Sequence, residues 1–113
     1  MSNLINLLHI LIFVPFFFYL YYTRENVPSW MCKLCIFIGV TGLLYHFYKV
    51  CTTTLKYTRW VNLVHIWYVF PLLIYIGFKC KAERMWFEAL LLFAFAALGY
   101  HSFNLVKYNL LTN

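Results

Sequence analysis

Long apolar stretches separated by short polar segments dominate this sequence. They cover residues 4–22, 30–50, 60–78 and 85–107, with approximate borders. A helix needs roughly 20 mainly apolar residues to cross the hydrocarbon of a bilayer. The runs are continuous rather than alternating, which does not fit barrel strands, and helices satisfy their backbone groups internally. The pattern therefore predicts an all-α, polytopic membrane protein with four transmembrane helices.

Composition supports lipid as the solvent of these helices. Hydrophobic residues make up 65% of the 113-residue chain and charged residues 11%, against about 25% charged residues in soluble domains. So short a chain cannot bury that much apolar surface in water. We therefore expect a single membrane domain over residues 1–113, with the lipid bilayer as its main partner.

The positive charge of the chain does not indicate a nucleic-acid partner. The net charge is +6, but the nine Lys and Arg residues are scattered singly between apolar runs, whereas a nucleic-acid footprint needs clustered charge. Four spans place both termini on one membrane face. That face carries four of the basic residues (Lys49, Lys56, Arg59, Lys107), and the other carries five (Arg24, Lys33, Lys79, Lys81, Arg84). The positive-inside rule therefore does not decide the orientation.

An internal duplication organises the chain. Asn6-Leu7-Leu8-His9-Ile10 recurs as Asn62-Leu63-Val64-His65-Ile66, and Pro15, Tyr19 and Trp30 recur at the same offset as Pro71, Tyr75 and Trp86. Later in each copy Tyr45-His46 matches Tyr100-His101, and Gly39 and Gly42 match Ala94 and Ala97. We define repeat one as residues 4–51 and repeat two as residues 60–108, with approximate borders. The duplication predicts a four-helix bundle of two tandem, parallel helical hairpins, related by a pseudo-twofold axis along the membrane normal.

Two prolines and two small-residue stripes shape the predicted helices. Pro15 and Pro71 lie within spans, where each removes a backbone donor and is expected to bend its helix. Our preferred interpretation is a fixed packing bend, and the alternative is a hinge or broken-helix binding site. Gly39 and Gly42 share a helical face with His46, and Ala94 and Ala97 share one with His101. Small residues of this kind allow close helix packing in membranes.

All four histidines belong to the repeat: His9, His46, His65 and His101. They lie near the starts of odd spans and the ends of even spans, roughly 5–10 Å below the face that carries the termini. The sequence therefore predicts one layer of four imidazoles, supported by Asn6, Asn62, Tyr45 and Tyr100. Polar faces of membrane helices normally turn toward the interior of the bundle.

Three interpretations of this layer follow. In the first, the polar side chains form hydrogen bonds that hold the helices together. In the second, the histidines bind a cofactor: a non-covalent b-type haem through two imidazoles, or zinc or copper through three or four. The third is a proton or ion channel, because histidine titrates near neutrality. The lower half of the spans offers few polar residues for such a path.

Enzymatic chemistry has little support in the sequence. A Ser-His-Asp triad is impossible because the chain contains no Asp, and Glu25, Glu83 and Glu88 lie on the membrane face opposite the histidines. Cys32 and Cys35 form a C-x-x-C, but no second pair completes a zinc site. We interpret the cysteines as small apolar residues. Because Cys80 is expected on the same membrane side as Cys32 and Cys35, a thiol cluster is the alternative.

The repeated Asn-Leu-x-His-Ile…Pro pattern, together with the segments 44–49 and 97–101, resembles small four-span membrane proteins encoded by giant viruses with large double-stranded DNA genomes. The resemblance covers nearly the whole chain. It implies a viral protein of a host-derived internal membrane or of the virion's inner membrane. Its implied partners are other viral membrane or capsid proteins, or further copies of itself. The leading hypothesis is therefore a non-enzymatic structural or interaction protein of a viral membrane.

Overall fold

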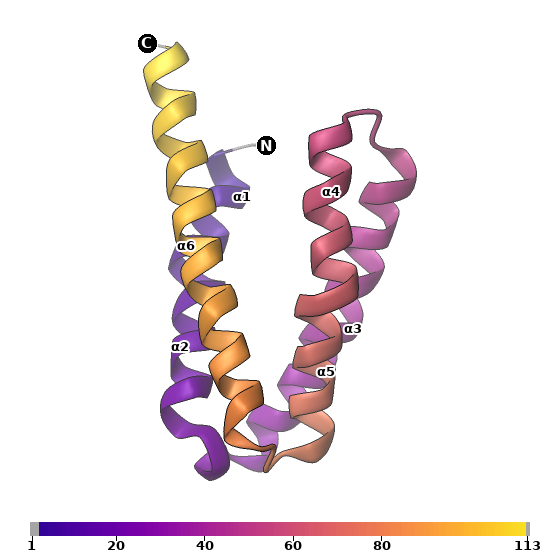
Figure 1. The fold of residues 1–113 in the computed structure, drawn as a ribbon, viewed down its shortest axis with the longest axis vertical. Coiled ribbons are helices and arrows are strands. Elements are labelled where there is room, and N and C mark those ends of the chain that lie inside the picture. The colour runs from indigo at the N-terminus through magenta and orange to yellow at the C-terminus, as the bar shows by residue number, and fades with distance from the viewer. Residues whose placement is uncertain (1–2, 113) are drawn as a thin grey trace. The chain divides into compact units, whose positions relative to one another are not determined.

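The computed structural model describes residues 3–112, and the side chains of residues 3–109. Throughout this part of the chain the regular structure is helical (Figure 1). The elements in chain order are α1 (Asn3–Leu8), η1 (His9–Phe13), α2 (Val14–Thr23), η2 (Arg24–Asn26), α3 (Ser29–Thr52), α4 (Lys56–Val64), η3 (His65–Val69), α5 (Phe70–Lys79) and α6 (Arg84–Thr112). Both η1 and η3 are π-helical turns, and η2 is a 3₁₀ turn.

Four continuous helices of the described residues are long and apolar enough to cross a membrane. They are Asn3–Asn26, Ser29–Thr52, Lys56–Lys79 and Arg84–Asn109. This confirms the all-α, four-helix prediction. The third helix begins at Lys56 rather than near residue 60, because its first turn is polar and is not part of the apolar run that marked the span.

The chain divides into two compact units, and each unit takes one long helix from each sequence repeat. Unit 1 contains the chain up to Thr23 and from Phe87 onward. Unit 2 contains Arg24–Trp86. The first span thus packs with the fourth, and the second packs with the third.

Unit 2 is an antiparallel helix pair in which α3 packs along α4, η3 and α5 (Figure 1). Glycines bring the two backbones together. A Cβ on Gly39 of α3 would lie 2.5 Å from Ile74 Cγ1, and one on Gly77 of α5 would lie 2.7 Å from the carbonyl oxygen of Cys32. Close approach of this kind replaces the hydrophobic effect as the attraction between helices in lipid.

Unit 1 pairs α6 with the α1–η1–α2 helix, again antiparallel. His101 contacts His9 near one end, and Phe95 packs edge-on against Phe18 farther along, with ring centroids 5.3 Å apart. Its fully buried apolar side chains include Leu20, Phe87 and Leu90.

Candidate functional site

An Asn–His–His cluster joins the two helices of unit 1. Asn6 is fully buried and His101 nearly so. The Nδ1 of His101 lies 2.9 Å from Oδ1 of Asn6, and the Nδ1 of His9 lies 2.8 Å from the carbonyl oxygen of Ile5. The His9 and His101 rings stack with centroids 4.0 Å apart and planes 19° from parallel. Residues from the two ends of the chain thus form one polar contact.

Unit 2 contains the same cluster at the repeat-equivalent positions. Nδ1 of His46 lies 2.5 Å from Oδ1 of Asn62, and Nδ1 of His65 lies 2.7 Å from the carbonyl oxygen of Val61. The His46 and His65 rings stack at 4.4 Å, only 5° from parallel. The structure therefore brings the predicted histidines together in pairs, one pair within each unit.

The two tyrosines expected beside the histidines contact them through their rings. Tyr45 lies edge-on to His46 with centroids 5.3 Å apart, and Tyr100 lies edge-on to His101 at 5.0 Å. These perpendicular contacts suit the positive edge and negative face of aromatic rings. The tyrosines therefore help to hold the rings of the even-span histidines.

The hydrogen bonds fix which nitrogen of each histidine carries the proton. A carbonyl oxygen can only accept, so His9 and His65 donate from Nδ1. In unit 2, Nδ2 of Asn62 donates to the carbonyl oxygen of Thr58 at 2.7 Å, so its Oδ1 must face His46 and accept. In unit 1, Nδ1 of His101 faces Oδ1 of Asn6, an oxygen that can only accept, so His101 donates to it. All four imidazoles therefore carry Nδ1–H, and in the neutral form their Nε2 is the basic nitrogen.

The arrangement limits how a metal could use the histidines of one unit. Two axial ligands of one haem iron stand on opposite sides of it, with ring centroids roughly 6 Å apart along one line. The stacked pairs, at 4.0 and 4.4 Å, do not have this geometry. Among the described side chains, neither unit gathers three or more His, Cys, Asp or Glu residues into a group that could hold a metal ion. A haem or metal role for His9, His46, His65 and His101 stays a prediction.

Each predicted proline bend coincides with a π-helical turn. η1 ends immediately before Val14-Pro15, and η3 ends immediately before Phe70-Pro71. The backbone N–H of Val14 bonds to the carbonyl of His9, and that of Phe70 bonds to the carbonyl of His65. This widened turn accommodates the missing proline donor, as π turns inserted in α-helices do. The first residue of each π turn is a cluster histidine, so the turns also set where His9 and His65 stand.

The small-residue stripes take different positions in the two units. In unit 2, a Cβ on Gly42 would overlap the ring of Phe70, and Gly39 faces Ile74. In unit 1, Ala94 is fully buried and Ala97 is half-buried. The predicted stripe is therefore a place of close helix contact in unit 2.

A disulfide that the sequence analysis did not predict closes one end of unit 2. Cys32 in the first turns of α3 is bonded to Cys80 after α5, with the Cα atoms 5.4 Å apart. Cys35 is buried and free, and Cys51 is exposed and free. The shared membrane side of Cys32 and Cys80 was the available signal, but spacing alone cannot select the pair.

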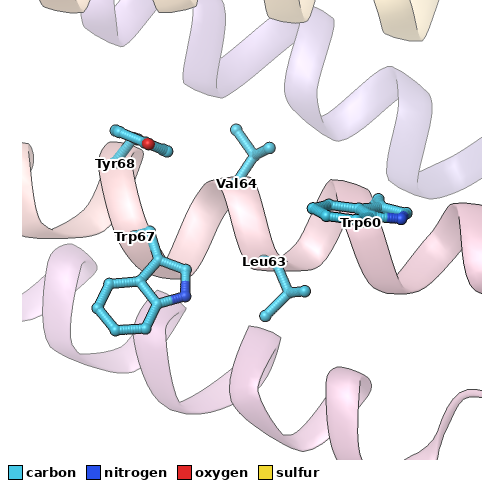
Figure 2. Close-up of a pocket in the computed structure, with 5 residues that line it drawn as sticks. All are labelled: Trp60, Leu63, Val64, Trp67 and Tyr68. Atoms are coloured by element: carbon cyan, nitrogen blue, oxygen red, sulfur yellow. The ribbon is translucent and has the colours of Figure 1, made fainter.

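A shallow groove runs along the surface of α4 and η3 in unit 2 (Figure 2). Its five lining residues, Trp60, Leu63, Val64, Trp67 and Tyr68, recur every three or four positions along one helix. Because all its walls come from neighbouring side chains of this stretch, the groove is an apolar stripe rather than an enclosed ligand cavity.

No protein-family model, curated protein sequence or solved structure matches this chain. The candidate site consists of two equivalent Asn–His–His clusters, each joining two helices that carry no other buried polar side chains among the described residues.

Proposed function

We propose that the protein is a non-enzymatic, multi-pass membrane protein that acts as a structural or interaction component of a viral membrane. The observation that carries this proposal is the use of its buried polar side chains. Asn6 and Asn62 each accept a hydrogen bond from a histidine on the partner helix. Such bonds contribute about 1 kcal/mol or less each in membrane proteins, and they hold helices together without any reacting group.

The duplicated clusters support the proposed architecture of two tandem parallel repeats in one four-helix bundle. The two π turns, the two Asn–His bonds and the two stacked histidine pairs fall at matching repeat positions. A twofold axis that relates the repeats exchanges span one with span three and span two with span four. It therefore converts the pair of spans one and four into the pair of spans three and two. The composition of the units therefore agrees with the proposed symmetry.

The connections between the long helices leave little chain for other activities. Within the described residues, the segments that join the spans are Val27–Pro28, Thr53–Leu55 and Cys80–Glu83. Segments this short offer no room for a catalytic or recognition domain. Interactions with partners would therefore use the helix surfaces, such as the apolar stripe on α4 and η3 (Figure 2).

The viral setting rests on the resemblance to giant-virus membrane proteins, and virion composition tests it. We expect the protein in purified virions of the encoding virus, in amounts comparable with other membrane components, and resistant to alkaline carbonate extraction. Quantitative mass spectrometry of gradient-purified virions measures this directly. Abundance in infected-cell membranes together with absence from virions would exclude the structural role.

The same purified protein separates the structural role from a cofactor role. We expect a preparation from cells supplied with haem and metals to be colourless above 350 nm and metal-free by elemental analysis. A Soret band lost in the His9→Ala/His65→Ala variant would instead establish haem binding. The matched control is Tyr45→Phe, which keeps every imidazole.

A further inference from the structure

Helix α3 carries three cysteines, and the two nearest its ends are in opposite chemical states. Cys32, in its first turns, is disulfide-bonded to Cys80, whereas Cys51, in its last turn, is exposed and free. At 1.5 Å per residue, roughly 28 Å of helix separates the two, close to the ~30 Å hydrocarbon thickness of a bilayer. The bonded cysteine and the exposed thiol thus lie at opposite ends of one helix, and the free thiol of Cys35, near Cys32, is buried and shielded.

The fold builds the Cys32–Cys80 contact from its backbone. Gly77 lets α5 approach so closely that a Cβ there would lie 2.7 Å from the carbonyl oxygen of Cys32. One turn later Cys80 ends α5 with φ 59°, the left-handed conformation that normally favours glycine, and its N–H bonds to the carbonyl of Ile76 at 2.9 Å. A non-glycine residue persists there only when its surroundings fix it. The resulting Cα–Cα distance of 5.4 Å lies within the disulfide range.

Disulfides persist in oxidising compartments, and exposed thiols persist where the glutathione and thioredoxin systems keep them reduced. Resting on the proposed membrane insertion, we infer that the end of unit 2 holding Cys32 and Cys80 faces an oxidising compartment, the lumen of the endoplasmic reticulum or its equivalent. The end with Thr53–Leu55 and Cys51 faces the reducing cytosol. This assigns the membrane orientation. The positive-inside rule had left it undecided, because the two faces carry five and four basic residues.

The Cys32–Cys80 disulfide forms by thiol–disulfide exchange with an oxidoreductase of that compartment. The thiolate of one cysteine attacks the enzyme's disulfide and forms a mixed disulfide, and the second thiolate then displaces the enzyme. The Cys32–Cys80 bond forms, the enzyme's disulfide breaks, and two electrons and two protons leave with the enzyme's reduced thiols. Cys32 is buried in the folded unit, so this step precedes the final packing of α3 against α5.

Thiol counting on the full chain tests the bond. Protein from a eukaryotic host is denatured in SDS with N-ethylmaleimide, then reduced and labelled with maleimide-polyethylene glycol. We expect two additions after reduction in the wild type and in Cys35→Ala and Cys51→Ala. The Cys32→Ala and Cys80→Ala variants should show no maleimide-polyethylene glycol addition after reduction. No addition in the wild type, or loss of both in Cys35→Ala, would overturn the inference, the latter because the bond would join the C-x-x-C.

Glycosylation mapping tests the orientation. The same hydrophilic segment with an Asn-x-Thr acceptor is inserted between Lys81 and Ala82 in one variant and between Thr53 and Thr54 in the other. We expect an endoglycosidase-sensitive shift in the first variant only, because the acceptor must reach the lumen. A glycan on the second variant alone would reverse the orientation and overturn the inference.

Carbonate extraction keeps this inference separate from the proposed function. A chain released by carbonate would refute membrane insertion itself. A chain that stays in the membrane with Cys32 and Cys80 reduced, or with the 53–55 loop glycosylated, would refute the orientation and leave insertion intact.

Discussion

Each unit contains its own Asn–His–His cluster, and the two units differ in what surrounds it. In unit 2, Asn62 uses both ends of its amide, accepting from His46 and donating to the carbonyl of Thr58. In unit 1, the amide nitrogen of Asn6 is buried and has no hydrogen-bond partner among the described residues. Unit 2 also has a disulfide and three glycines at helix contacts, whereas the glycine of unit 1, Gly99, faces open space.

The polar contact is thus the same at the repeat-equivalent positions, whereas the packing around it differs between the units. We expect the cluster to set which helix faces meet, and the disulfide and the glycines of unit 2 to set how strongly its helices are held. Experiment can separate the units because all four tryptophans lie within Arg24–Trp86. Tryptophan fluorescence therefore follows unit 2, and helical circular dichroism follows the whole chain.

The largest expected effect is the loss of the disulfide. A bridge across a separation of 48 residues stabilises by about 2–4 kcal/mol, chiefly through the unfolded state. We expect the free energy of unfolding of the Cys32→Ala/Cys80→Ala variant to fall by that amount. The tryptophan fluorescence transition in an SDS titration should then occur at a lower SDS concentration. Reduced wild type should shift equally, which controls for lost packing, and Cys51→Ala should not shift. Unchanged fluorescence transitions in both would show that the bridge does not stabilise unit 2.

A glycine substitution compares the packing of the two units. Gly77→Ala places a methyl group against the carbonyl of Cys32 and the side chain of Ile36. Because a backbone carbonyl cannot rotate away, we expect a loss of about 1–3 kcal/mol, measured by the same titration. Gly99→Ala in unit 1 is the matched control and should cost nothing, since no atom lies within 4 Å of its added Cβ. Equal losses would contradict the tighter packing of unit 2.

The asparagines test whether the clusters are energetically equivalent. Asn62→Leu removes two hydrogen bonds and leaves the Nδ1–H of His46 without its acceptor, so we expect a loss of about 1–2 kcal/mol. Asn6→Leu removes one hydrogen bond and also a buried amide nitrogen that lacks a partner among the described residues. The loss of stability in Asn6→Leu should therefore be about 1 kcal/mol smaller than in Asn62→Leu. Circular dichroism across an SDS titration measures both. A larger loss for Asn6→Leu would reverse the comparison.

The sequence predicted the helices and their polar faces, but it said much less about which helix packs against which. Apolar runs located the four spans, and the duplication selected Asn6, His9 and their equivalents. Periodicity tells which side of a helix is special but not which helix covers it, so the pairing of His101 with Asn6 could not be foreseen. The π turns depend on how the backbone adjusts around Pro15 and Pro71. The disulfide depends on the close approach at Gly77.

The smallest expected effect concerns the loop end of unit 2, outside the spans. The pKa of the Glu83 carboxyl lies below its usual range, chiefly because its own backbone N–H stabilises the carboxylate. Partial desolvation acts against this, and Tyr75, Lys79 and Trp86 further lower the pKa of this carboxyl. The Tyr75 hydroxyl donates to it at 3.2 Å, and Lys79 Nζ lies 3.7 Å away. A lowered pKa means that the charged carboxylate stabilises the fold above the ordinary carboxyl range, near pH 4.3. That contribution is lost as the pH falls through the folded-state pKa.

We therefore expect Glu83→Gln to be slightly less stable than the wild type at pH 7, and the difference to vanish in more acidic buffer. The effect stays small because the carboxylate is exposed to solvent and screened by salt. Trp86, whose ring lies 5.4 Å from that of Tyr75, gives a local fluorescence signal for the titration. Glu88→Gln is the control for a loss of negative charge close by in the chain. A difference between Glu83→Gln and wild type that grows on acidification would have the wrong sign for a depressed pKa and would contradict the Tyr75–Glu83–Lys79 contact.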